Sequence, residues 1–246
     1  MDGLKNLVTI KEASLKLQGN KFDLLYSTGV INKILDLSKN SEVRIVQRAV
    51  SLIVDVSELN HAQIEDCLVK NNIFKRLKLV IKNYPKNMIL MKQSFLIVSN
   101  LIVGDNHELT IKKLIKSGLL KTILNVLENK SFEKVWMEAV RVLSKVVEFS
   151  NILMRIQIEN KFILSKQLAL MLQNSKGNNK IQMNVLQTIP HILDIDKFFF
   201  SDKVSPKIIF KNNGGVDCLK YLQNKSCRDT FFHSNSMVEN YYPEHR

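Results

Sequence analysis

Apolar residues recur along the chain in stretches that have the spacing of amphipathic helices. In GLLKTILNVLEN (118–129), five leucines and isoleucines stand at i, i+1, i+4, i+5 and i+8, which places them on one wide face of a helix. The 246 residues include eight glycines and four prolines. That is too few chain breakers for an all-β fold, which needs a turn about every 8–12 residues. The pattern therefore predicts an all-helical protein.

Four long apolar stretches can be laid over one another as copies of one helix, which we call the third helix of a repeat. In this register Asp55, Asn100, Lys145 and His191 are equivalent, at steps of 45, 45 and 46 residues. A second apolar segment precedes each copy, and a fifth copy begins with GGVDCLKYLQN. The four stretches are VRIVQRAVSLIVDVSE (43–58), LMKQSFLIVSNLIVG (90–104), WMEAVRVLSKVVE (136–148) and IQMNVLQTIPHILDI (181–195).

The repeat length lies in the range of about 40–47 residues that is expected of armadillo and HEAT units. Glycine precedes the second helix in three copies, at a corner that requires positive φ or close backbone approach, and this favours armadillo over HEAT. In the other two copies Asn72 and Asn160 stand near that corner, and asparagine also tolerates the left-handed conformation. The three glycine positions are Gly29, Gly118 and Gly214-Gly215.

We therefore expect an all-α armadillo-repeat solenoid, a right-handed superhelix of about five repeats in a single domain over 1–246. One such unit cannot bury its apolar face alone, so stacked units must share a continuous core. Leu124, Ile97 and Leu143 are expected in that core, together with Trp136. The expected repeats span about 22–58, 60–104, 106–150, 151–195 and 207–242, with a partial N-terminal repeat at 1–20.

The composition limits the kinds of partner and site that the chain is expected to have. The net charge of +13 is compatible with a polyanionic partner, but the lysines are scattered singly and in pairs, which favours a lysine-rich composition over a nucleic-acid interface. Three dispersed cysteines predict neither a disulfide framework nor a zinc site. The longest apolar stretch, at Phe95–Val103, is about half of a roughly 20-residue membrane span, and the N-terminus does not resemble a secretory signal. A soluble protein of a reducing compartment, without a membrane partner, is expected.

The sequence contains none of the common catalytic motifs. Phosphate-binding glycine loops, H-E-x-x-H and G-x-S-x-G are all missing, and the five histidines are isolated from one another. His191 is interpreted as a packing or groove residue. The chain is therefore not expected to be an enzyme or to hold a metal or cofactor.

The C-terminal segment KNNGGVDCLKYLQNKSCRDTFFHSNSMVENYYPEH resembles the last armadillo repeat of the importin-α family. The matching features are Gly214-Gly215, Leu222-Gln223-Asn224 and the Val-Glu-Asn-Tyr-Tyr run at 238–242. Segments 60–74, 99–129 and 178–193 are similar to the junctions and the penultimate repeat of that family. The resemblance covers about 22–242 and corresponds to the C-terminal half of an importin-α, without its early repeats or its basic importin-β-binding segment. It implies an adaptor for nuclear import, found in cytoplasm and nucleus, that binds nuclear-localisation-signal peptides of cargo proteins and also an export receptor.

In that family a tryptophan and an asparagine, four residues apart on successive third helices, line a concave peptide-binding groove. The resemblance gives Asn100 the role of an amide clamp that projects into solvent, and Leu96 that of an apolar shelf. Glu138 and Asp55 would meet basic side chains of the peptide. The family pairs correspond here to Ser51/Asp55, Leu96/Asn100 and Arg141/Lys145, and Gln93 stands in the preceding repeat where Glu138 stands in its own.

The departures from the family leave other partners open. None of the three pairs keeps its tryptophan, so the cation–π attraction for lysine, about 0.5–2 kcal/mol per contact, is lost. Arg141 and Lys145 place like charge where a lysine of the peptide would bind. The alternatives are an armadillo scaffold for an acidic or apolar protein partner and, third, direct binding of nucleic acid. An acidic groove would favour the adaptor, and a continuous basic groove the alternatives.

Overall fold

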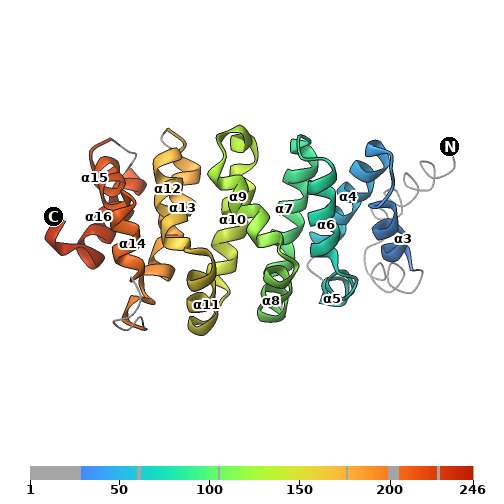
Figure 1. The fold of residues 1–246 in the computed structure, drawn as a ribbon, viewed down its shortest axis with the longest axis horizontal. Coiled ribbons are helices and arrows are strands. Elements are labelled where there is room, and N and C mark those ends of the chain that lie inside the picture. Colours follow the sequence, from blue (N-terminus) through green and yellow to red (C-terminus); the bar gives the residue numbers. More distant parts are fainter. Residues whose placement is uncertain are drawn as a thin grey trace. The chain divides into compact units, whose positions relative to one another are not determined.

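The computed structural model describes residues 29–59, 62–104, 106–175, 177–198, 205–225 and 228–245, and every regular element in these ranges is helical (Figure 1). The expected partial repeat at 1–20 and the start of the expected first repeat, 22–28, lie outside the described residues. None of the helices in these ranges is long and apolar enough to cross a membrane.

The helices recur in the order first, second and third. First helices are α5 (Ala62–Lys70), α8 (His107–Ser117), α11 (Ile152–Phe162) and α14 (Pro206–Asn212). Second helices are α3 (Val30–Leu37), α6 (Ile73–Asn83), α9 (Leu119–Glu128), α12 (Leu164–Asn174) and α15 (Gly215–Lys225). Third helices are α4 (Val43–Ser57), α7 (Met88–Ile102), α10 (Glu133–Glu148), α13 (Asn179–Leu193) and α16 (Arg228–Tyr241). Short 3₁₀ turns are η1 (Lys130–Phe132), η2 (Asp196–Phe198) and η3 (Pro243–His245).

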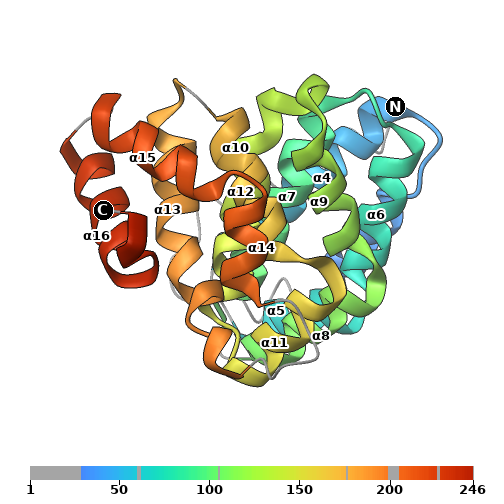
Figure 2. The same ribbon diagram turned by 60° about the vertical axis from the view of Figure 1, so that its left-hand side comes forward.

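The chain divides into two compact units, 1–119 and 120–246. In the first unit α4 packs against α3 and α7, and α6 packs against α7. In the second unit α13 lies between α10 and α16 and packs against α12 (Figure 2). In both units, therefore, a third helix contacts the third helix of the next repeat and the second helix of its own. A single domain over 1–246, with the repeat boundaries given above, stays a prediction.

The expected core residues are buried. Leu124, Ile97 and Leu143 are each less than 5% exposed, because the wide apolar stripes of second and third helices face one another inside their units. Trp136 is also buried, and its indole N–H donates to the carbonyl of Val126 at 3.0 Å. The prediction that Trp136 is a core residue is confirmed.

Several helix starts are stabilised by asparagine or serine side chains. An N-cap side chain that accepts a hydrogen bond from the backbone N–H three residues later satisfies a donor that has no partner within the helix. Asn87 does this for α7, Asn151 for α11, Asn178 for α13 and Ser205 for α14. These asparagine and serine side chains therefore help to determine where the four helices begin.

The corner before the second helix has the left-handed backbone that the sequence predicts in four copies. The φ angles there are 66° at Gly29, 76° at Gly118, 76° at Gly214 and 57° at Asn72.

The fourth copy corrects the sequence-based expectation. Asn160 lies inside α11, and Ile163, with a φ of 53°, takes the left-handed position. The left-handed residue directly precedes α12, and here it is a β-branched isoleucine, for which this conformation costs about 1–2 kcal/mol.

A buried carboxyl group supports this strained corner. Glu159 of α11 accepts hydrogen bonds from the backbone N–H and the hydroxyl of Ser165, at the start of α12. Burial raises the pKa of Glu159, and the hydrogen bonds from Ser165 and Leu164 partly oppose that rise. The carboxyl group thus takes the place of the N-cap side chain that Ile163 cannot supply.

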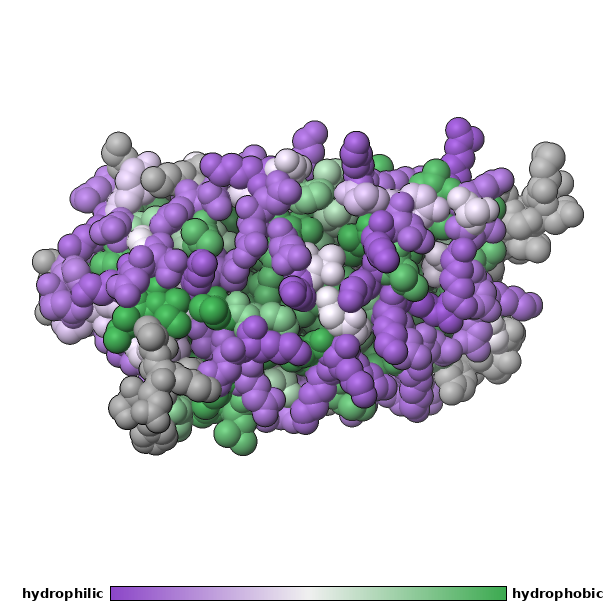
Figure 3. Space-filling model, viewed as in Figure 1, coloured by the Kyte–Doolittle hydropathy of each residue, from purple (hydrophilic) through white to green (hydrophobic). Residues whose placement is uncertain are grey.

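The face of the molecule that carries α12 and α14 is mainly hydrophilic (Figure 3). A hydrophobic patch lies over α14, where Ile208 is 50% exposed. This patch belongs to a first helix, whereas the expected groove belongs to third helices.

Candidate functional site

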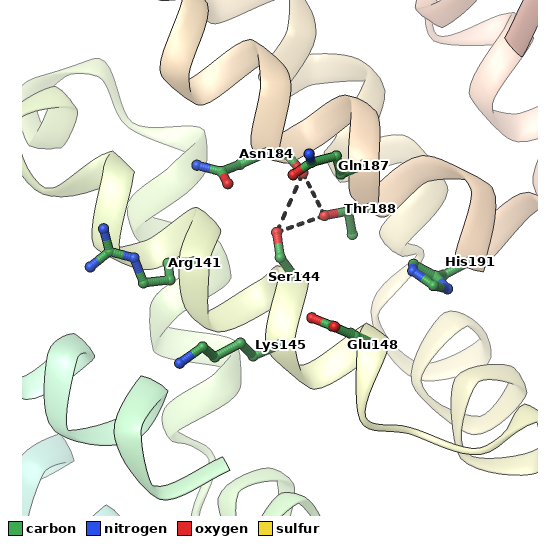
Figure 4. A pocket seen from close by; sticks show the side chains of 8 residues that line it. All are labelled: Arg141, Ser144, Lys145, Glu148, Asn184, Gln187, Thr188 and His191. Atoms are coloured by element: carbon green, nitrogen blue, oxygen red, sulfur yellow. Dashed lines mark hydrogen bonds between the residues drawn. The ribbon is translucent and has the colours of Figure 1, made fainter. Parts of the chain in front are cut away.

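A cavity of about 410 Å³ opens between the third helices α10 and α13 of the second unit (Figure 4). On each helix the lining residues stand at i, i+3, i+4 and i+7, so each set occupies a single helical face. Its volume lies within the roughly 300–1,000 Å³ of typical ligand pockets. The lining residues are Arg141, Ser144, Lys145 and Glu148 of α10, and Asn184, Gln187, Thr188 and His191 of α13.

Two hydroxyl groups join the helices at the floor of the cavity. The Ser144 and Thr188 oxygens lie 2.6 Å apart, and the Thr188 oxygen lies 2.7 Å from the carbonyl of Asn184. The Ser144 oxygen also lies 3.4 Å from the Asn184 carbonyl, so either hydroxyl can be the donor of the shared bond. In either arrangement both protons are used inside the protein, and only oxygen lone pairs remain for a ligand.

The amide side chains of α13 supply both donors and acceptors. Gln187 is exposed, and Asn184 is half-buried with its amide nitrogen 3.4 Å from the sulfur of Met137. A thioether is a weak acceptor, so this contact is easily exchanged for a stronger one. The amides give α13 the groups that an extended backbone would need.

Positive charge gathers on one side of the cavity. In Figure 4 the side chains of Arg141 and Lys145 extend to the same side of α10, away from His191. Burial lowers the pKa of Lys145, the positive charge of Arg141 lowers it further, and the negative charge of Glu148 opposes the change. Like charges at i and i+4 on a helix destabilise each other, so this side of the cavity favours an anion.

His191 forms the opposite side. Burial and the positive charge of Arg155 lower its pKa from the usual value near 6.5, and the negative charges of Glu148 and Asp194 partly oppose the change, so the neutral form is favoured. A neutral imidazole has one N–H donor and one nitrogen acceptor. His191 can therefore make a hydrogen bond of either kind without adding charge.

Of the site residues proposed from the sequence, three lie on α10. Arg141 and Lys145 line the cavity. Glu138, one turn earlier, is only 8% exposed, so the expectation that it meets basic side chains of a ligand is corrected. One of its carboxylate oxygens, Oε2, is fully buried.

The other five lie on α4 and α7, the two packed third helices of the first unit. Asp55 is exposed, while Ser51, Gln93 and Leu96 are half-buried. Asn100 is also half-buried, and its amide nitrogen donates to the Ser57 hydroxyl at 3.0 Å. The expectation that the Asn100 amide projects into solvent is therefore corrected, because it connects α7 to α4.

Five of the eight cavity residues were missed by reasoning from the sequence, and a sixth, His191, was recognised only as a packing or groove residue. A signal for two of the six existed, since a step of 46 residues leads from Arg141 to Gln187 and from Lys145 to His191. The other four lie three residues before or after these residues, on the same helical faces. The missed residues are Ser144, Glu148, Asn184, Gln187 and Thr188.

Histidine, cysteine and acidic side chains do not gather into a metal site in the described ranges. No group of three or more of them is close enough to hold a metal ion there.

Comparisons with known proteins give the fold. No protein-family model and no curated protein matches the sequence. A designed armadillo-repeat protein in complex with the peptide (KR)4 is similar, with a TM-score of 0.76 and 16% identity over 96% of this chain and 91% of that one. Computationally designed armadillo-repeat proteins for modular peptide recognition reach a TM-score of 0.72 at 16% identity, over 97% and 91% of the two chains. A further designed armadillo-repeat protein has a TM-score of 0.69 at 17% identity, over 93% and 90%. The all-α armadillo-repeat fold is thus confirmed.

Proposed function

We propose that this chain is a non-enzymatic armadillo scaffold that binds an extended peptide along the third helices of its repeats. The observation that carries the proposal is the polar cavity between α10 and α13, lined by one face of each helix. Proteins of the same fold give further support, since one is in complex with the peptide (KR)4 and others were designed for modular peptide recognition.

The lining suits a peptide backbone better than a reaction. Each residue of an extended peptide presents one N–H and one C=O group that lose water on binding and need partners. The amides of Asn184, which is half-buried, and Gln187, which is exposed, each offer both a donor and an acceptor. The hydroxyl groups of Ser144 and Thr188 use their protons in hydrogen bonds to each other and to the Asn184 carbonyl, which leaves them poor candidates for nucleophiles.

The test is a fluorescence-anisotropy titration with three labelled ten-residue peptides, one rich in Lys and Arg, one rich in Glu and Asp, and one neutral and polar. We expect at least one peptide to bind, and Gln187→Ala to weaken it about fivefold, the effect of one lost hydrogen bond. Gln63→Ala, at an exposed glutamine of α5, is the matched control and should leave the affinity unchanged. If the wild-type protein binds none of the three peptides at low salt, the proposal is wrong.

A second candidate is the importin-α-like adaptor for nuclear-localisation signals. The exposed carboxylates of Asp55 on α4 and Glu148 on α10 favour it, because they can pair with basic side chains. The binding of (KR)4 by a protein of the same fold is also in its favour. Nuclear cargo, an export receptor, and a place in cytoplasm and nucleus belong to this candidate.

The same titration separates the two candidates. Tight binding of the Lys/Arg-rich peptide, weakened by Asp55→Asn and not by Asp66→Asn on α5, would favour the adaptor. Weak binding of that peptide beside tight binding of another would favour a scaffold with a different partner.

A further inference from the structure

We propose that the cavity between α10 and α13 receives an acidic side chain, a glutamate or aspartate of the bound peptide, so that the partner is an acidic segment of a protein. This inference rests on the proposed peptide-binding function and names the class of its ligand. The acidic segment has the opposite charge to the basic signal that the adaptor would bind.

The first argument is the charge of the lining. Arg141 and Lys145 stand one turn apart on α10 and both border the cavity, while Glu148 lies beyond Lys145. Within the described residues Arg141 forms no ion pair, so its guanidinium group is open to a ligand. A carboxylate placed beside Arg141 would relieve the repulsion between the two cations. A lysine placed there would add a third.

The second argument is the geometry of the donors. The planar guanidinium group of Arg141 can hold both oxygens of a carboxylate at once, and the Lys145 ammonium group adds a point charge nearby. From the facing helix, the Gln187 amide offers an N–H donor. Lys145 is half-buried, and attraction between charges is stronger where water is partly excluded.

The third argument is long-range and concerns the whole chain. A net charge of +13 attracts acidic segments and repels basic ones before contact. Nucleic acid would share this attraction. The cavity, however, has no phenylalanine, tyrosine or tryptophan in its lining on which bases could stack, and Arg141 and Lys145 are its only arginine and lysine. An acidic peptide is therefore the better match.

The experiment compares a glutamate-containing ten-residue peptide with the same peptide carrying glutamine in place of each glutamate. We expect the wild-type protein to prefer the glutamate peptide at least about tenfold, the effect of a charge-assisted pair of hydrogen bonds. The double variant Arg141→Gln/Lys145→Gln should lose that preference. The double variant Lys121→Gln/Lys166→Gln removes the same total charge from exposed sites on α9 and α12 and should keep it within about twofold.

A charge exchange makes the test specific to the cavity. Arg141→Glu should reject the glutamate peptide and bind a version with lysine at the contacted position more tightly than wild type does. Because Arg141 is exposed, these variants should fold, and circular-dichroism melting curves would establish that they do.

The outcomes separate the two proposals. If the wild-type protein binds a peptide through Gln187 but shows no preference for glutamate, only the inference about the cavity is wrong. If it binds no peptide, both are wrong. If it binds a fifteen-residue oligothymidine through Arg141 and Lys145 and ignores the glutamate peptide, the cavity serves nucleic acid, and the inference is again overturned.

Discussion

The bond between Asn100 and Ser57 can be tested by removing each side chain in turn. The Asn100 amide nitrogen donates to the Ser57 hydroxyl at 3.0 Å, and that hydroxyl donates its own proton to the carbonyl of Val54 at 2.8 Å. Ser57 is 1% exposed, so water cannot readily replace a lost donor. Asn100→Ala therefore leaves a lone pair of a buried hydroxyl without its present partner.

The expected loss follows from these contacts. One net hydrogen bond contributes about 0.5–1.5 kcal/mol, and a fully buried, unpartnered polar group costs about 1–3 kcal/mol. Ser57 keeps its bond to Val54, and Asn100 is only half-buried, which places the loss from the broken contact at about 1.5 kcal/mol, where the two ranges overlap. The better helix propensity of alanine over asparagine offsets about 0.5 kcal/mol of this loss. We expect Asn100→Ala to lower the free energy of unfolding by about 1 kcal/mol.

The assay is urea unfolding followed by circular dichroism, on Asn100→Ala, Ser57→Ala and the double variant. With a typical urea dependence of about 1–3 kcal/mol/M, a loss of 1 kcal/mol moves the midpoint by roughly 0.3–1 M. The double-variant cycle should give a coupling of about 0.5–1.5 kcal/mol. Ser51→Ala, at a half-buried serine of the same helix as Ser57, is the control and should change the free energy by less than about 0.5 kcal/mol. Additive effects, with Asn100→Ala within about 0.3 kcal/mol of wild type, would refute the reasoning and leave Asn100 available to a ligand.

Three further predictions concern other parts of the fold. Leu143→Ala removes a side chain that is 1% exposed and should lower the free energy of unfolding by about 2–5 kcal/mol, as measured with urea. Arg141→Ala, at an exposed position of the same helix, should lower it by less than about 0.5 kcal/mol. Equal effects would mean that the assignment of buried and exposed faces is wrong. Gly29→Ala should cost about 0.5–1 kcal/mol, since a new Cβ would meet nothing within 4 Å and only the left-handed φ of 66° opposes it, while Gly29→Asn should cost less. The pKa of Glu159 is raised in the folded protein, so above about pH 4.5 the folded protein keeps a proton on Glu159 that the unfolded chain has released. The free energy of unfolding should therefore fall as the pH rises from about 4.5 through that raised pKa. Glu159→Gln should lack this fall when unfolding is measured between pH 4 and 8, and an identical pH profile in both proteins would contradict the assignment.

The repeat and its helices could be read from the sequence because they depend on local and periodic features. The spacing of apolar residues sets which face of each helix is buried, and a step of 45 or 46 residues places the third helices in register. The left-handed corners at Gly118 and Asn72 could likewise be predicted, since few residue types tolerate that backbone. Of these corners, only the one at Ile163 was not predicted, because a β-branched residue rarely adopts the left-handed conformation.

The roles of the polar side chains on the third helices could not be predicted in the same way. Whether a polar side chain on a third helix meets solvent, a ligand or a neighbouring helix depends on residues more than forty positions away. Asn100 meets Ser57, 43 residues earlier, and the hydroxyl of Ser144 meets that of Thr188, 44 residues later. Periodicity identified the apolar stripe, but it carries no information about which polar atoms lie within hydrogen-bond distance across two helices.

The sequence by itself therefore determined the helices, their repeat and the buried stripes, because each depends on a residue's own preference and on regular spacing. The tertiary structure alone decided that Glu138 is buried, that Asn100 is bonded to α4, and that Arg141 and Lys145 share a cavity with Gln187 and His191. These outcomes depend on how closely two helices approach and on the rotation of each about its axis. Such small displacements decide which polar groups keep their water and which exchange it for a partner.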